Sequence, residues 1–124
     1  MMLSVGNDIL LIKRMENSLK NPRFTARVFG SEEQKQLAGR PVQSYAAAFS
    51  AKESFAKAIG TGIRGFSLNE VQLLHDDLGA PYLKLEGNAK ALVEQKNMGF
   101  CVSVSHCEEY VSVVVIGYQK GAVL

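Results

Sequence analysis

Cysteine, net charge and long apolar runs are all scarce in this sequence, and each shortage narrows what the protein can be. The two cysteines, Cys101 and Cys107, are expected to be free thiols in a reducing compartment. Their spacing fits none of the usual zinc patterns, and no second pair of cysteine or histidine residues completes a site. A formal net charge of +2 is too small to indicate nucleic-acid binding by itself.

The sequence also lacks a recognisable targeting or membrane segment. Residues 1–5 are too short for the apolar region of a signal peptide, and Asp8 interrupts the apolar residues that follow. No apolar run approaches the length that spans a bilayer. We therefore expect a cytoplasmic protein with no membrane partner.

What is present is typical of a folded globular protein. Hydrophobic residues make up 47% of the chain and charged residues 21%, a balance that argues against disorder across the whole chain. A length of 124 residues, without an internal repeat, low-complexity tract or linker, predicts one domain over residues 1–124.

Positive charge is concentrated in the first quarter of the chain, where Glu16 is the only acid between Asp8 and Glu32. A basic helix face of this kind could meet an acidic partner, but it could also be a solvated surface without one. The basic residues concerned are Lys13, Arg14, Lys20, Arg23 and Arg27.

The pattern of apolar runs and turn signals predicts an α+β fold, with mostly antiparallel sheet packed on one long helix and on shorter helices. The clearest helix spans Val42–Ile59, which is rich in alanine and stops at Gly60. Another helix is expected to begin at Ser31 as its N-cap, with Gln34 completing a capping box. The remaining expected elements are a strand over Leu3–Ile12, a helix over Ile12–Leu19 that Pro22 interrupts, a hairpin of Ser67–Leu74 with Tyr82–Leu85, a helix over Asn88–Lys96, and a hairpin of Phe100–Ser105 with Tyr110–Tyr118.

Glu53 and Lys57 are the first candidates for chemistry. They lie four residues apart in the long helix and therefore share one face. Most pairs with this spacing are ordinary surface ion pairs, but this helix is apolar on nearly every side. Charges on a largely buried helix need a partner or a function.

Asp8 follows Gly6 and Asn7 at the end of an apolar strand, where a turn or cap aspartate would be an ordinary explanation. Together with Glu53, however, it could supply oxygen ligands to Mg²⁺. Magnesium usually takes one or two protein carboxylates and completes its octahedron with water and substrate phosphates. Two carboxylates beside Lys57 would therefore suit a pyrophosphate substrate.

The remaining polar signals are weaker. His106 comes just past a predicted strand, a usual place for a functional side chain, although a hairpin-turn histidine without a function is equally ordinary. His75 is interpreted in that second way. Hydrolase chemistry has little support, because no nucleophile elbow is present. The glycines after the long helix do not form a P-loop, because the order GxxxxGK[ST] is absent, and Gly60 is explained as a helix C-cap.

Taken together, these residues resemble those of the holo-acyl-carrier-protein synthase family, the small 4′-phosphopantetheinyl transferases. The resemblance extends over essentially the whole chain in order and spacing, and its second motif is the specific one. The motifs are Gly6–Ile9 continuing to Ile12–Arg14, then Phe49–Ala58 followed by Gly60–Gly62, then Gly79–Pro81, and finally Val102–His106. Ser54 departs mildly, since the family often has alanine there.

The resemblance implies a 4′-phosphopantetheinyl transferase-like fold and a role for each matching residue. Asp8, Glu53 and Lys57 would be catalytic. Asp8 and Glu53 would hold Mg²⁺ at the coenzyme A pyrophosphate, and Lys57 would contact the phosphates and stabilise charge during transfer. Coenzyme A would also be bound by Gly60, Thr61, Gly62, Pro81 and His106. Arg14, and by position Arg23 and Arg27, would face the acidic recognition helix of acyl carrier protein.

The resemblance further implies a homotrimer with active sites at protomer interfaces, acting in fatty acid biosynthesis. Two other classes of function stay open from the sequence alone. A coenzyme A or nucleotide-binding module without catalysis would keep Lys57 and His106 but would not need both acids. A structural trimer that docks an acidic partner through its basic helix would show no dependence on Mg²⁺.

Overall fold

The computed structural model describes residues 3–121 of the chain. Three antiparallel strands form the larger sheet in the order β1 (Leu3–Leu11), β5 (Tyr110–Gln119) and β4 (Met98–His106). The strands β4 and β5 are the predicted C-terminal hairpin, and β1 joins the outer side of β5, where Asp8 lies opposite Val113. Side chains alternate between the two faces of this sheet, so one face can be buried while the other meets solvent.

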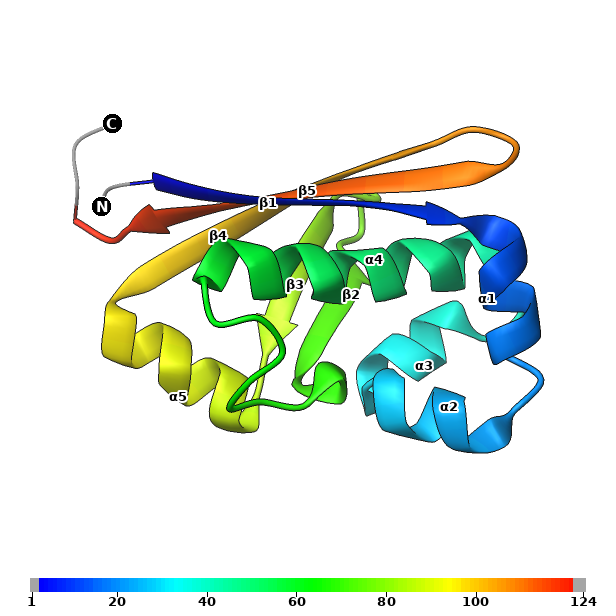
Figure 1. The fold of residues 1–124 in the computed structure, drawn as a ribbon, viewed down its shortest axis with the longest axis horizontal. Coiled ribbons are helices and arrows are strands. Elements are labelled where there is room, and N and C mark those ends of the chain that lie inside the picture. Colours follow the sequence, from blue (N-terminus) through cyan, green and yellow to red (C-terminus); the bar gives the residue numbers. More distant parts are fainter. Residues whose placement is uncertain (1–2, 122–124) are drawn as a thin grey trace.

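The long helix α4 (Val42–Ile59) lies along the buried face of this sheet (Figure 1). Its alanines allow close packing, and they line the helix together with the fully buried Phe55. Gly60 ends the helix in the left-handed conformation, as its predicted C-cap role requires.

Three short helices gather near the N-terminal end of α4 (Figure 1): α1 (Ile12–Ser18), α2 (Pro22–Val28) and α3 (Ser31–Leu37). Pro22 interrupts the first helix as expected, and it also begins α2, a helix that the sequence did not predict. Proline suits a first helical turn, and the Asn21 side chain caps this one by accepting the Arg23 backbone N–H at 3.0 Å.

The predicted cap of α3 is wrong by one residue. Gly30, not Ser31, is the N-cap, and its N–H donates to the Glu33 side chain at 3.1 Å. Gln34 instead donates from its side chain to the Phe29 carbonyl at 2.7 Å. The reason is a tertiary contact: the Glu33 side chain is buried, where it forms an ion pair with the Lys52 ammonium.

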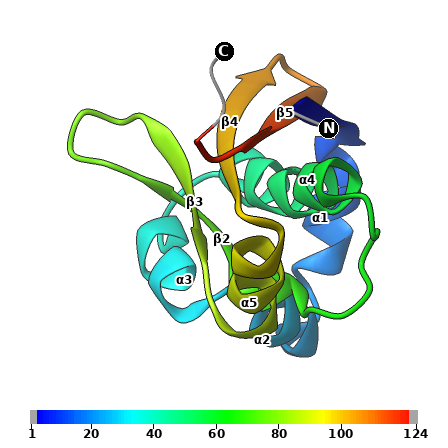
Figure 2. The ribbon, with the colours of Figure 1, turned by 90° about the vertical axis from the view of Figure 1, so that its left-hand side faces the viewer.

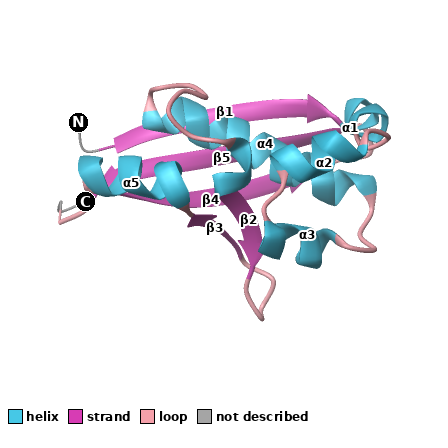
Figure 3. Ribbon diagram, turned by 90° about the horizontal axis from the view of Figure 1, so that it is seen from below, coloured by secondary structure: helices cyan, strands magenta, loops and turns pink. Residues whose placement is uncertain are grey.

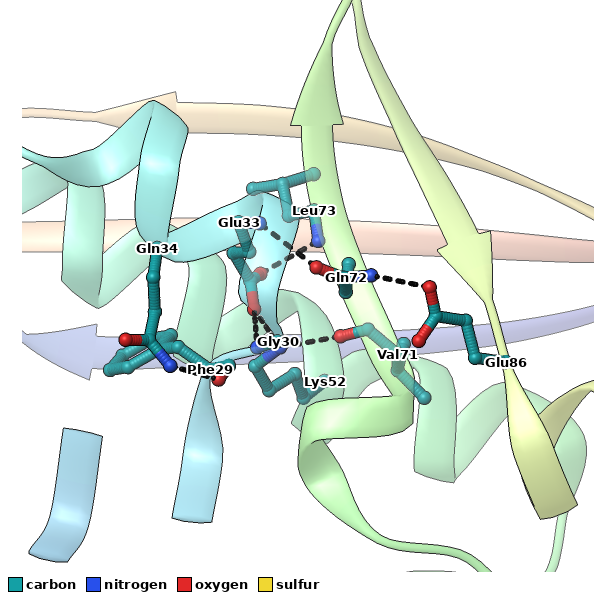
Figure 4. A network of polar contacts seen from close by, with 9 residues as sticks. All are labelled: Phe29, Gly30, Glu33, Gln34, Lys52, Val71, Gln72, Leu73 and Glu86. Atoms are coloured by element: carbon teal, nitrogen blue, oxygen red, sulfur yellow. Dashed lines mark hydrogen bonds and ion pairs between the residues drawn. The ribbon is translucent and has the colours of Figure 1, made fainter. Parts of the chain in front are cut away.

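Lys52 and Glu33 form a fully buried ion pair that ties α3 to α4 (Figure 4). Lys52 Nζ donates to Glu33 Oε1 at 2.6 Å and to the Val71 carbonyl, and the Leu73 N–H donates to Glu33 Oε2 at 2.7 Å. Burial alone lowers the pKa of Lys52 and raises the pKa of Glu33, while their mutual attraction opposes both shifts. The Lys52 ammonium therefore does not reach water.

The second sheet is a two-stranded hairpin of β2 (Val71–His75) and β3 (Pro81–Leu85), whose tip protrudes from the body (Figure 2). The first predicted strand of this hairpin began too early, because residues Leu68–Glu70 form a 3₁₀ turn. The Glu70 side chain fixes that turn by accepting the Ser67 N–H at 2.8 Å and the Asn88 N–H at 2.8 Å. Asn88 belongs to α5 (Gly87–Lys96), the last helix.

The predicted α+β class and the antiparallel pairing are confirmed. The helices lie on one side of the β1–β5–β4 sheet, and no described element covers its other face (Figures 1 and 3). That uncovered face carries exposed apolar side chains: Ile9 is 67% exposed and Val5 is 65% exposed. Both cysteines are free, as expected, and both are exposed. Within residues 3–121 no helix is long and apolar enough to cross a membrane.

Candidate active site

The site begins where β1 crosses the backbone of α4. Gly6 allows this crossing, because a Cβ at that position would overlap the main-chain carbonyl oxygen of Ser54 and lie 2.8 Å from the Ala58 nitrogen. The φ of Gly6 is not in the left-handed region, so its absent side chain, rather than its conformational freedom, is what the structure uses. The close approach places Asn7 and Asp8 directly against the exposed edge of the helix.

Asp8 is held there by two groups from α4. Ser50 donates its hydroxyl to Asp8 Oδ2 at 2.7 Å, and Lys57 Nζ lies 3.6 Å from Asp8 Oδ1. The Asp8 side chain is 19% exposed, so its carboxylate is partly desolvated but still open on one side.

Glu53 lies beside Asp8, and both residues line one cavity of about 370 Å³. Partial burial raises the pKa of Glu53, the nearby Asp8 carboxylate raises it further, and the Lys57 ammonium opposes the rise. A cation bound next to both carboxylates would favour the charged form of Glu53. The fold therefore brings the N-terminal aspartate and the mid-helix glutamate to one cavity, and their role as metal ligands stays a prediction.

This donor set fits Mg²⁺. The ligand atoms available are carboxylate oxygens, and within residues 3–121 no three histidine, cysteine or acidic side chains gather into a larger metal cluster. A cage of many protein ligands would suit calcium or zinc, whereas one or two carboxylates with room for water and phosphate suit magnesium. The cavity of about 370 Å³ supplies that room.

Lys57 stands at the rim of the same site, one helical turn beyond Glu53. Its side chain is 55% exposed, and its ammonium donates to the Asn7 carbonyl at 2.7 Å. This contact points the charge back over the Asp8 end of the cavity. An ammonium held here could meet a phosphate that bridges the cavity and the solvent.

The predicted carrier-binding arginines lie around this region, although at different distances from the acids. Arg14 lines the cavity of Asp8 and Glu53, while Arg27 lines an adjoining cavity of about 660 Å³. The two cavities share Phe24 and Phe49, whose ring centroids are 5.9 Å apart. Arg23 is exposed on the same helix as Arg27 but lines neither cavity.

The other predicted coenzyme A residues do not reach the cavity of Asp8 and Glu53 within this chain. His106 is exposed at the end of β4, and Pro81 begins β3 in the protruding hairpin. Gly60 lines a different cavity, beside Leu3 and Ser4. Thr61 and Gly62 follow it in the loop after α4, where the Gly62 N–H closes back on the Ala56 carbonyl at 3.2 Å.

Two contributors to the site were not predicted from the sequence. Ser50 was read only as part of a motif, although it precedes Glu53 by three residues and therefore shares its helix face. Phe24, which joins the two cavities, belongs to the helix that was missed. The available signal for Ser50 was a hydroxyl side chain three residues before a candidate acid, on the same helix face.

The chain is similar to known proteins in both sequence and fold. The family model of the ACPS type, described as the 4′-phosphopantetheinyl transferase superfamily, matches residues 4–112. A holo-[acyl-carrier-protein] synthase of Fusobacterium nucleatum is 36% identical over 120 residues, covering 94% of this chain and 98% of the relative.

Solved structures of two such synthases share the fold of this chain. The holo-[acyl-carrier-protein] synthase of Neisseria meningitidis superimposes with a TM-score of 0.87 and 34% identity, covering 96% of this chain and 100% of that one. A holo-(acyl-carrier-protein) synthase of Bacillus anthracis in complex with CoA (3′,5′-ADP) superimposes with a TM-score of 0.82 and 26% identity, covering 97% and 100%.

Proposed function

This chain belongs to the 4′-phosphopantetheinyl transferase superfamily, and we propose that it transfers 4′-phosphopantetheine from coenzyme A to a serine of apo-acyl carrier protein. The products are holo-acyl carrier protein and adenosine 3′,5′-bisphosphate. In this reaction the serine oxygen bonds to the β-phosphorus of coenzyme A, and the bond from that phosphorus to the bridging pyrophosphate oxygen breaks. The proton of the serine hydroxyl passes to a base.

The observation that supports the proposal is that Asp8 and Glu53 line one cavity, with the Lys57 ammonium 3.6 Å from Asp8 Oδ1. We assign Asp8 and Glu53 as the residues that hold Mg²⁺. When bound, this ion neutralises charge on the pyrophosphate. Such transfers are catalysed mainly by positioning and charge stabilisation, so the site needs no protein nucleophile.

We assign charge stabilisation and proton transfer to residues of the chain by their positions in the site. Lys57, exposed and directed over the Asp8 end, would stabilise charge on the phosphates. Glu53 has a raised pKa and is one candidate for the base that accepts the serine proton. A metal-bound water is the other.

The adjoining cavities indicate where the carrier protein would dock. Arg14 and Arg27 flank an apolar surface that includes Phe24 and Phe49, and Arg23 extends the positive charge along α2. An acidic helix with apolar residues on one face would match both features. We assign the carrier of cytoplasmic fatty acid biosynthesis to this surface, by analogy with the family.

The uncovered sheet face supports the proposal of a homotrimer. A sheet that exposes Leu3, Val5, Ile9 and Ile116 on one face is a surface suited to burial against further copies of the chain. His106 and Pro81 point to the same arrangement, because neither reaches the acids of its own chain. In a ring of three identical subunits they would complete a neighbour's site.

The test is to weigh the carrier after incubation with the protein, coenzyme A and Mg²⁺. A mass gain of one phosphopantetheine group is expected from the wild type, and none from Asp8→Ala or Glu53→Ala. Lys84→Ala is the matched control, because Lys84 forms surface ion pairs with Glu32 and Glu86 outside the site. Tight coenzyme A binding with no mass gain would instead identify a binding module without catalysis.

A further inference from the structure

We propose that Ser50 is a positioning residue that holds one oxygen of Asp8, Oδ2, by a hydrogen bond and so presents the other oxygen, Oδ1, to the metal. The inference rests on the metal site of the proposed function, and concerns a residue of this chain to which that function assigns no role. It adds that Asp8 would be held in a fixed orientation before a cation binds.

The contact is direct and enclosed. Ser50 is completely buried, and its hydroxyl lies 2.7 Å from Asp8 Oδ2. A serine hydroxyl has one proton to donate, and a carboxylate can only accept, so the donor in this pair is Ser50. Serines inside helices commonly donate to a carbonyl of the preceding turn, whereas this one donates across to β1.

The two oxygens of Asp8 therefore differ in their availability. Oδ2 accepts the buried hydroxyl, while Oδ1 faces Lys57 at 3.6 Å, beyond an ordinary hydrogen-bond distance. Gly6 keeps β1 against the helix, so the backbone that carries Asp8 stays close to Ser50. Groups that orient a metal ligand in this way typically affect metal affinity by about 10- to 100-fold.

Ser54 offers a matched control on the same helix. It is also fully buried and also donates its hydroxyl, but to the Val113 carbonyl at 2.8 Å rather than to an acid. Removing either hydroxyl deletes one buried hydrogen bond of α4. Only the loss at Ser50 should change the metal site.

The experiment measures Mn²⁺ binding by electron paramagnetic resonance with saturating coenzyme A and no carrier protein. We expect Ser50→Ala to weaken Mn²⁺ binding about tenfold, and Ser54→Ala to leave it unchanged. The carrier mass assay should show a raised Mg²⁺ requirement for Ser50→Ala, with turnover largely recovered at high Mg²⁺. Ser50→Cys, close in size but a weak donor, should shift binding in the same direction, and it replaces the alanine variant if that variant does not fold.

Wild-type Mn²⁺ affinity in both Ser50 variants would overturn the inference, whatever their thermal stability. Asp8→Asn separates this result from failure of the proposed function. If Asp8→Asn binds Mn²⁺ as tightly as the wild type, Asp8 is not a ligand, and the metal site is refuted together with the role of Ser50.

Discussion

Gly6 and Ser54 are in backbone contact: the Cα of the glycine lies against the carbonyl oxygen of the serine, in a space that no side chain could share. Through this contact β1 crosses α4 at close range, and the next two residues of the strand reach Ser50 and Lys57. The position of Asp8 is therefore set by a missing side chain two residues earlier.

Gly6→Ala should destabilise the protein and reduce transfer together. The added Cβ meets main-chain atoms of α4, which cannot rotate away as a side chain could, so the strand must shift. Overpacking of this kind costs about 1–3 kcal/mol or more, and the shift would also separate Asp8 from Ser50. Thermal unfolding and the carrier mass assay measure the two effects. A stable Gly6→Ala protein with full activity would show that β1 can move without disturbing the acids.

Glu53→Gln should be inactive yet more stable than the wild type at neutral pH when no metal is present. The folded pKa of Glu53 is raised, so its contribution to stability is complete below the usual glutamate range and is lost as pH rises through the folded pKa. Glutamine avoids this loss. Thermal midpoints of both proteins should therefore converge near pH 4 and separate towards pH 7.

Adding Mg²⁺ with coenzyme A should reverse that order, because only the wild type keeps both proposed carboxylate ligands. Equal thermal midpoints of the two proteins across the whole pH range would mean that burial and the Asp8 carboxylate do not raise the pKa of Glu53. Asp77→Asn, a change at an exposed hairpin residue, is the control for simple loss of a negative charge.

Lys52→Met should destabilise the fold strongly, by about 3–5 kcal/mol. It would leave Glu33 fully buried without its cation, although the N–H groups of Gly30 and Leu73 would still donate to it. The double change Lys52→Met with Glu33→Gln should recover much of the loss, since no buried charge remains. Chemical denaturation measures both. A double variant no more stable than Lys52→Met would indicate that shape at this position, rather than charge pairing, supports α3.

The sequence predicted the elements governed by local pattern and missed those governed by distant contacts. The long helix and both hairpins follow from periodicity and glycine stops. The predicted cap of α3 was wrong because the position of Glu33 is set by its ion pair with Lys52, 19 residues away in sequence. The strand expected from Ser67 was shortened because Glu70 bonds Asn88. The acids of the site could be nominated from their residue types, but only the Gly6 crossing explains why they meet.

Arg27→Glu should weaken carrier binding without changing the KM for coenzyme A. Arg27 is exposed and lines the adjoining cavity, not the cavity of Asp8 and Glu53. Reversing its charge should therefore not disturb a bound metal. Arg14→Glu could do so, because Arg14 lines the same cavity as the two acids. The KM for the carrier should rise, and its dependence on salt should flatten, because opposite charges steer association and ions screen them. Lys90→Glu, the same charge reversal on the exposed side of α5, is the matched control. A changed KM for coenzyme A alone would place Arg27 at the substrate instead.

Mixed assemblies of the proposed homotrimer should decide whether His106 serves a neighbouring protomer. Glu53→Ala and His106→Ala proteins are expected to be nearly inactive separately, but co-assembled trimers would contain sites that take Glu53 from one protomer and His106 from another. Random assembly of equal amounts in a three-membered ring would restore about a quarter of the sites. Glu53→Ala mixed with Asp8→Ala should restore none, because both acids line one cavity of the same chain. If His106 acted within its own chain, the first mixture would be as inactive as the second, since every protomer would then lack one of the two residues.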